Sequence, residues 1–133
     1  MRIVRDVMHG DIEVLRTTET AADAACFLAA HSEDSVPLCQ GDGSLAGTVS
    51  NRDIVARVVA TGRDPHQVRL AEFAQPSGVL ALDVDVSVDE AVAVMCQHDK
   101  ERLPVVEGDR VVGFVTQRDA ARSVAFRPPW DDV

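Results

Sequence analysis

Residues 47–53 read GTVSNRD, and residues 113–119 read GFVTQRD. The two stretches share Gly, Val, Arg and Asp at matched places, and a hydroxyl residue, Ser50 or Thr116, stands three positions before each Asp. Self-similarity of this kind is the sign of an internal repeat. We therefore predict that the chain consists of two copies of one structural unit.

The similarity extends upstream of this motif. Three features precede each copy in the same order: an opening segment at residues 3–8 (IVRDVM) or 68–73 (VRLAEF), a helix start at 20–24 (TAADA) or 87–91 (SVDEA), and an apolar residue before proline, Val36-Pro37 or Leu103-Pro104. These matches predict a first repeat at residues 1–62, a linker at 63–69, a second repeat at 70–124 and a tail at 125–133 that contains Trp130. Because one repeat alone buries little surface, we expect the two halves to share one core.

Composition limits the classes of protein that fit. The chain has 133 residues and a net charge of −9, and 46% of it is apolar but only 4% aromatic, so we expect a core of Val, Ala, Leu and Ile. The negative charge argues against a nucleic-acid partner, since binding a phosphate backbone needs a basic face. No apolar run approaches the roughly 20 residues of a membrane span, and the first residues contain no apolar signal segment. We expect a cytoplasmic protein with no membrane partner.

The sequence contains no spacing of residues that is typical of a catalytic or metal-binding site. Ser, His and Asp are all present, but there is no Gly-x-Ser-x-Gly motif and no P-loop, so we predict no catalytic residue and no enzyme activity. A metal or redox role is an alternative that would use the histidines and the scattered, odd-numbered cysteines: His9, His31, His98, Cys26, Cys39 and Cys96. Since Cys-x-x-Cys and His-Glu-x-x-His are absent, we assign no metal site and expect reduced thiols.

The pattern of apolar residues predicts the same elements in each repeat. Ala21, Ala24, Ala25 and Leu28 lie on one face of a helix that a hydroxyl such as Thr20 can cap and that runs to about His31. Ala91, Val92 and Met95 do the same after Ser87. Two apolar runs joined by a Gly/Asp turn then predict a hairpin in each copy, at residues 36–49 and 103–115.

The repeated motif falls where the second strand of each hairpin hands over to a helix. Ser50 and Thr116 stand at the N-cap position, so one interpretation is that they only start helices. The other interpretation is a ligand site, because free N–H groups at a helix start attract anions. On this view the carboxylate three residues later is not needed for capping and suits the two hydroxyls of a ribose.

These residues resemble the CBS domain, named after cystathionine beta-synthase, and the chain resembles a stand-alone pair of such domains over residues 2–124. The stretch from Asn51 to Pro65 is similar to bacterial two-CBS proteins related to hypoxic-response and other stress proteins. The resemblance implies an α/β (α+β) fold of two β-α-β-β-α repeats about a pseudo-twofold axis, with two clefts between the copies. Family members commonly bind adenine nucleotides or S-adenosylmethionine there, and they usually regulate rather than catalyse.

The resemblance also implies roles for particular residues. Asp53 and Asp119 match the ribose-binding carboxylates of the family, Ser50 and Thr116 match hydroxyls near the ribose or phosphate, and Arg52 and Arg118 match a position that is often basic. A cleft pairs the Asp of one copy with the x-Pro strand of the other, so Asp53 is expected to face Arg102 and Pro104, and Asp119 to face Ser35 and Pro37. Because only the first of these clefts gains an arginine, we expect the Asp53 cleft to favour a phosphorylated ligand.

The prediction is a cytoplasmic regulatory module, a homodimer, that requires no cofactor. It binds AMP, ATP or S-adenosylmethionine and signals to an unknown protein partner. The acidic background of Asp83, Asp85, Asp89 and Glu90 disfavours a polyphosphate. One alternative is a ligand-free interaction module whose copies serve dimerisation. The other is the metal- or redox-responsive stress protein described above.

Overall fold

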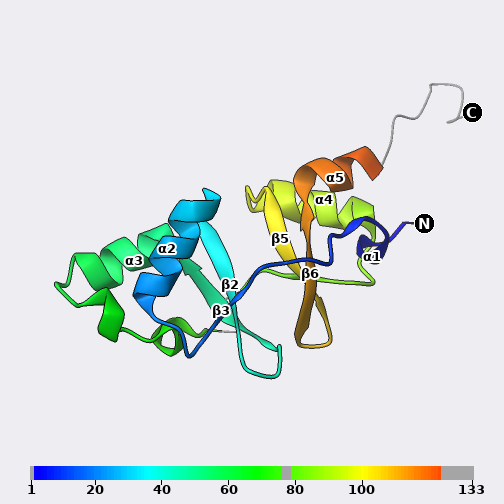
Figure 1. Cartoon of the computed structure of the whole chain (residues 1–133). Helices are drawn as coiled ribbons and strands as arrows, with labels where there is room; N and C mark the ends of the chain where they lie inside the picture. The colour runs from blue at the N-terminus through cyan, green and yellow to red at the C-terminus, as the bar shows by residue number, and fades with distance from the viewer. Residues whose placement is uncertain (1, 76–78, 124–133) are drawn as a thin grey trace, which may run out of the picture. The chain divides into compact units, whose positions relative to one another are not determined.

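The computed structural model describes residues 2–75 and 79–123 of the chain (Figure 1). The chain forms two compact units. The first, here called the Asp53 unit, comprises Glu13–Val79 and Asp109–Val111; the second, the Asp119 unit, comprises Met1–Ile12, Leu80–Gly108 and Val112–Val133. The division into units is a property of contacts, and the predicted boundaries of the repeated sequence and its linker stay a prediction. Trp130 and the predicted tail lie outside the described residues.

The Asp53 unit is built on a three-stranded sheet of order β1-β2-β3. Strand β1 pairs in parallel with β2, and β2 pairs antiparallel with β3. The elements, in chain order, are β1 (Leu15–Arg16), α2 (Ala21–His31), β2 (Ser35–Cys39), β3 (Leu45–Ser50), α3 (Asn51–Ile54), a π-helical stretch (Val55–Val59) and two 3₁₀ turns (Pro65–Gln67 and Leu70–Phe73).

The Asp119 unit repeats this plan with a sheet of order β4-β5-β6. Its elements are α1 (Val4–Val7), β4 (Leu82–Asp83), α4 (Val88–Gln97), β5 (Arg102–Glu107), β6 (Arg110–Thr116) and α5 (Gln117–Ser123). Strand β4 pairs in parallel with β5, as β1 does with β2. Two copies of one strand-helix-strand-strand-helix arrangement confirm the predicted α+β class.

The helices form where local sequence favours them. The hydroxyl of Thr20 accepts a hydrogen bond from the Asp23 N–H and caps α2, and Ser87 caps α4 through the N–H of Glu90. The apolar spacing then puts one side of each helix into the core, as predicted: Ala21, Ala24 and Leu28 are buried in α2, and Ala91 and Met95 in α4.

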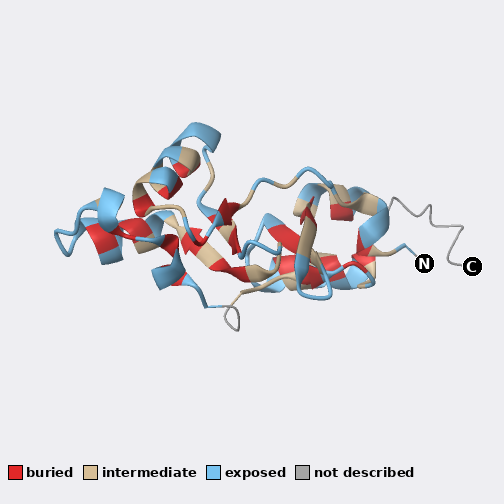
Figure 2. Cartoon of the chain, turned by 60° about the horizontal axis from the view of Figure 1, so that its bottom comes forward, coloured by how far each residue is buried: buried red, intermediate tan, exposed pale blue. Residues whose placement is uncertain are grey.

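The buried residues form two clusters, one in each unit, and the expectation of a core shared by the two halves stays a prediction. One cluster centres on Val36, Leu38 and Val49, and the other on Met95, Val105 and Val115. Figure 2 shows the buried residues on the strands and on the inner sides of the helices. Each cluster also takes in an opening segment that the linear repeat assigns to the other half, which enlarges both cores.

The opening segments are attached by matching hydrogen bonds. In the Asp119 unit, the N–H groups of Val4 and Arg5 donate to the carbonyls of Val86 and Val84. In the Asp53 unit, Leu70 and Ala71 donate in the same way to Glu19 and Thr17. Val4 and Leu70 are thereby fully buried. The two opening segments are therefore structural counterparts, but residues 3–8 match residues 69–74, so the predicted match to 68–73 is one residue out.

The residues that follow these segments pair with the second strand of the hairpin. His9 bridges to Phe114 of β6, and Ala74 bridges to Gly47 of β3. The approach is close at both places, because a Cβ on Gly113 would lie 2.2 Å from the carbonyl oxygen of His9, and one on Gly47 would lie 2.9 Å from the Gln75 nitrogen. The glycine that opens each repeated motif thus leaves room for a passing backbone, and the register of the opening segments makes Gln75 the counterpart of His9.

Candidate functional site

Both repeated motifs lie at a strand-to-helix junction, from β3 to α3 and from β6 to α5. The Ser50 hydroxyl accepts a hydrogen bond from the Asp53 N–H, and the Thr116 hydroxyl accepts one from the Asp119 N–H, each at 3.1 Å. The predicted N-cap role is therefore confirmed for both hydroxyls. Each Asp stands at the third position of its helix, where its carboxylate is half-buried.

The Asp53 carboxylate takes part in capping, so the argument that capping does not need it is wrong. Its Oδ2 accepts the Ser50 N–H at 2.9 Å, which completes a reciprocal capping box. Thr20 and Asp23 make the same box at the start of α2. A hydroxyl three residues before an acid consequently marks a helix start first, and it identifies a ligand site only with further support.

The Asp119 carboxylate has a different partner. Its Oδ2 lies 2.5 Å from Nε2 of His9, and the side chains of Asp119 and His9 are 28% and 46% exposed. The His9 ring and, after it, the Thr116 hydroxyl hold the pKa of the Asp119 carboxyl below its ordinary value. Among the described residues, the backbone N–H of Thr116 does not donate to this carboxylate. Only one of the two hydrogen bonds of the Asp53 capping box therefore has a counterpart here.

The ring of His9 belongs to a short stack. It packs against the ring of Phe114 with centroids 4.8 Å apart and planes inclined by 22°. The Arg102 guanidinium carbon lies 3.8 Å from the centroid of the same Phe114 ring, a cation–π distance. Sequence reasoning considered His9 only as a metal or redox candidate and did not single out Phe114.

The structure groups the other predicted site residues by unit. Arg52 is exposed beside Asp53, and Pro37 pairs with Thr48 across the β2–β3 ladder. In the Asp119 unit, Arg118 is exposed beside Asp119, Arg102 is the exposed first residue of β5, and Pro104 is buried in that strand. The expected facing of Asp53 with Arg102 and Pro104, and of Asp119 with Pro37, joins residues of different units and stays a prediction.

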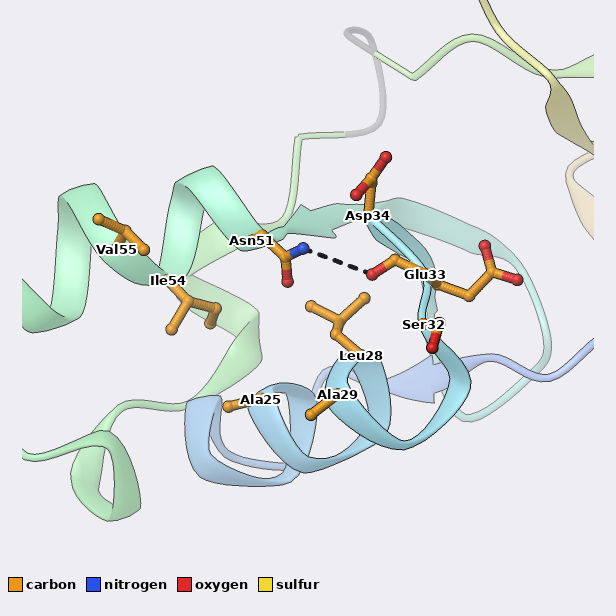
Figure 3. A pocket seen from close by; sticks show the side chains of 9 residues that line it. All are labelled: Ala25, Leu28, Ala29, Ser32, Glu33, Asp34, Asn51, Ile54 and Val55. Carbon is orange, nitrogen blue, oxygen red and sulfur yellow. Dashed lines mark hydrogen bonds between the residues drawn. The ribbon is translucent and has the colours of Figure 1, made fainter.

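A hollow of about 420 Å³ lies between α2 and α3 of the Asp53 unit (Figure 3). Its lining is mostly aliphatic, and the amide of Asn51 spans to the carbonyl of Glu33 at 3.4 Å. The lining residues are Ala25, Leu28, Ala29, Ser32, Glu33, Asp34, Asn51, Ile54 and Val55. Neither Ser50 nor Asp53 is among them, and the only charged side chains in this lining are acidic. This hollow therefore does not suit a phosphate and is separate from the candidate site.

Two histidines of the metal alternative, His9 and His31, have other contacts. His31 directs Nε2 to the Glu13 carboxylate at 3.1 Å and Nδ1 to the Phe27 carbonyl at 3.0 Å, with its ring stacked on that of Phe27. In the part of the chain that the structure describes, no group of three or more His, Cys, Asp or Glu side chains could hold a metal ion. No helix within the same residues has the length and apolarity needed to cross a bilayer.

Comparison with known proteins agrees with this architecture. Hypoxic response protein 1 of Mycobacterium tuberculosis is 34% identical over 122 residues, which cover 92% of this chain and 85% of that protein. The crystal structure of hypoxic response protein I with two coordinated zinc ions superimposes with a TM-score of 0.75 at 33% identity, covering 90% of this chain and 97% of that one.

A second solved structure is a CBS domain pair in complex with 5′-methylthioadenosine and S-adenosyl-L-methionine. It has a TM-score of 0.69 and 25% identity, and the match covers 93% of this chain and 96% of that chain. The CBS domain family itself matches residues 4–60 and 76–125, the two repeats on which the fold is built. The chain therefore belongs to the CBS domain family, as a pair of CBS domains.

Proposed function

We propose that this CBS pair is a regulatory module that binds an adenosyl ligand and signals its occupancy to a protein partner. The observation that carries the proposal is the repeated junction, which presents a half-buried carboxylate, Asp53 or Asp119, beside an exposed arginine. A carboxylate can accept hydrogen bonds from both hydroxyls of a ribose, and such charge-assisted hydrogen bonds are stronger than those between neutral groups. A similar CBS pair was solved with adenosyl ligands.

The chemistry of the two junctions fits a ligand with little negative charge. Arg52 and Arg118 each supply one cation, whereas the net charge of the chain is −9. Four acids lie on and before α4: Asp83, Asp85, Asp89 and Glu90. We therefore expect AMP or S-adenosylmethionine to bind better than free ATP, and we expect magnesium to improve the binding of ATP.

A thermal-shift and calorimetric titration with AMP, ATP and S-adenosylmethionine, with and without magnesium, tests this function. A ligand at about 100 times its Kd stabilises the native state by roughly 2.7 kcal/mol, a shift of several degrees. Asp53→Ala and Asp119→Ala should each weaken binding about tenfold or more at the site affected. The matched control is Asp23→Ala, which removes the carboxylate of an equivalent capping box outside the motif.

If Asp53→Ala and Asp119→Ala changed the affinity no more than Asp23→Ala does, the role of the motif carboxylates would be contradicted. An absence of any shift would contradict the adenosyl ligand itself. Cys26, Cys39 and Cys96 are free thiols, which fits the reducing cytoplasm that we propose as the compartment. The relationship to a hypoxic response protein supports a stress-related role.

Dimerisation is a second candidate function, and a specific feature favours it. Val55 and Val59 are 59% and 65% exposed, although both are large and apolar, and Val55 also lines the aliphatic hollow beside α2. A second copy of the chain would cover these side chains and make the protein a homodimer. Val59→Glu should then shift the dimer toward monomer in light scattering, whereas Ala71→Glu, at another exposed position of the same unit, should not.

A further inference from the structure

The two repeats differ at one position that bears directly on the candidate site. The hydrogen bonds that attach the opening segments make Val4 the counterpart of Leu70, and His9 the counterpart of Gln75. His9 reaches the carboxylate of its unit, whereas among the described residues no hydrogen bond joins the Gln75 side chain to Asp53. The strand residue on which the His9 ring stacks also differs between the repeats, because Phe114 stands where the first repeat has Thr48. The second repeat therefore contains a ring pair for which the first has no counterpart.

The two carboxylates consequently have different surroundings. Asp53 accepts the N–H of Ser50, a backbone group that belongs to its own helix start. Asp119 instead accepts from His9, a side chain 110 residues away in the chain, at 2.5 Å. Oδ2 of each carboxylate thus already accepts one hydrogen bond. At Asp53 the donor is a backbone N–H, whereas at Asp119 it is a side-chain ring that a ribose hydroxyl can displace.

The position of His9 is fixed from several sides. Its N–H donates to the Phe114 carbonyl at 2.8 Å, and the Phe114 N–H donates back at 2.9 Å. Its ring stacks on that of Phe114, which also contacts the guanidinium of Arg102. Exposed ion pairs are usually weak because two long side chains lose their freedom. Here the backbone hydrogen bonds and the stack have already restricted the ring. We therefore expect the contact with Asp119 to be stronger than an ordinary surface ion pair.

We propose that in the free protein His9 occupies the acceptor that Asp119 would offer a ribose, so that an adenosyl ligand binds first at Asp53 and reaches Asp119 only by displacing His9. This proposal rests on the proposed function and adds an order of occupancy to it. It also supplies an output, because the displaced ring belongs to the opening segment that is hydrogen-bonded to residues beside β4, to β6 and to the start of α4. Occupancy at Asp119 thereby acts on residues 2–9.

The experiment measures calorimetric binding of two probes, adenosine and AMP, to the full chain. Asp53→Ala serves as the background, because it leaves Asp119 as the remaining ribose acceptor. In this background His9→Ala should tighten both probes by about three- to tenfold, the range between a surface pair and a charge-assisted hydrogen bond. His9→Phe keeps a ring to stack on Phe114 but removes the donor, so it should give the same gain without disturbing the fold. His98→Ala, an exposed histidine of the same unit, is the matched control.

The possible results separate the two proposals. An equal gain for adenosine and AMP in both His9 variants, and none in His98→Ala, supports displacement. If AMP binds the wild type while the His9 variants bind both probes no better than the background, the displacement proposal is overturned and the proposed function stands. A loss for AMP alone would show that His9 attracts phosphate, which also overturns displacement. If neither probe binds any variant or the wild type, both proposals fall.

Discussion

Gly113 lies against the backbone of His9, and a Cβ on this glycine would be 2.2 Å from the carbonyl oxygen of His9. The atoms in conflict are backbone atoms that cannot rotate away, so Gly113→Ala must push the opening segment off β6. We expect a loss of about 1 to 3 kcal/mol of unfolding free energy in urea, the usual range for overpacking. Gly41→Ala is the control, because a Cβ there meets nothing within 4 Å. Equal effects of the two substitutions would contradict the close approach.

The contact between His9 and Asp119 predicts a pH dependence of stability. Hydrogen bonds from the His9 ring and the Thr116 hydroxyl lower the pKa of the Asp119 carboxyl in the folded state. A lowered pKa stabilises the fold above the unfolded value, near 3.9, and this contribution disappears as the pH falls through the folded value. The Tm of the wild type should therefore exceed that of Asp119→Asn at pH 6, and the difference should shrink below about pH 4.

The same comparison has an internal control in the His9→Phe background. Adding Asp119→Asn to His9→Phe should lower the Tm at pH 6 by less than Asp119→Asn lowers it in the wild type. The reason is that the first of the groups that lower the pKa of this carboxyl is already gone. An effect of Asp119→Asn that is the same in both backgrounds would mean that the Thr116 hydroxyl alone sets it.

Two capping hydroxyls separate stability from ligand binding. Thr20→Ala removes the cap of the 11-residue helix α2, and Ser50→Ala removes the cap of α3. Each should cost about 1 kcal/mol of unfolding free energy. Only Ser50→Ala should also weaken AMP in a calorimetric titration, because Thr20 lies outside the repeated motif. Equal affinity in the two variants would assign Ser50 to capping alone.

The three thiols should react at two different rates. Burial raises the pKa of the Cys39 thiol, which is 3% exposed, whereas Cys26 and Cys96 are exposed. Since the thiolate is the reactive form, a disulfide reagent should label two cysteines quickly in native protein and the third only in denaturant. Cys39→Ala should leave the fast phase intact and remove the slow one. Three fast thiols in the native wild type would contradict the buried position of Cys39.

Local features made most of the fold predictable from the sequence. Thr20, Ser87 and the alanine spacing that follows Thr20 determine where α2 and α4 begin and which side they bury, and these signals lie within a few residues of each other. The π-helical stretch Val55–Val59 was not predicted, because the buried residues at this point, Ile54 and Val58, keep the i, i+4 spacing of an ordinary α-helix. The attachment of Val4 and Leu70 was not predicted for a different reason, because it depends on partners far away in the sequence.

In the candidate site, too, local features were predicted from the sequence and long-range contacts were not. Ser50, Asp53, Thr116 and Asp119 were found because the repeat presents them twice. The capping role of Asp53 was underestimated, since the local hydrogen bond from the Ser50 N–H uses the same carboxylate that a ligand would use. The contact between His9 and Asp119 joins residues 110 positions apart, and only the folded chain brings them together.

The attachment of residues 2–9 to the second repeat has a consequence for synthesis on the ribosome. Translation produces this segment before the rest of its unit, because its partners at Val84, Val86 and Phe114 emerge only after the continuous stretch Glu13–Val79 is complete. Domains generally fold as units while the chain grows. We therefore expect most of the Asp53 unit to fold on the nascent chain. Val4 stays exposed until β6 and α5 have been synthesised. Residues 2–9 are thus made before the Asp53 unit but reach their folded position after it.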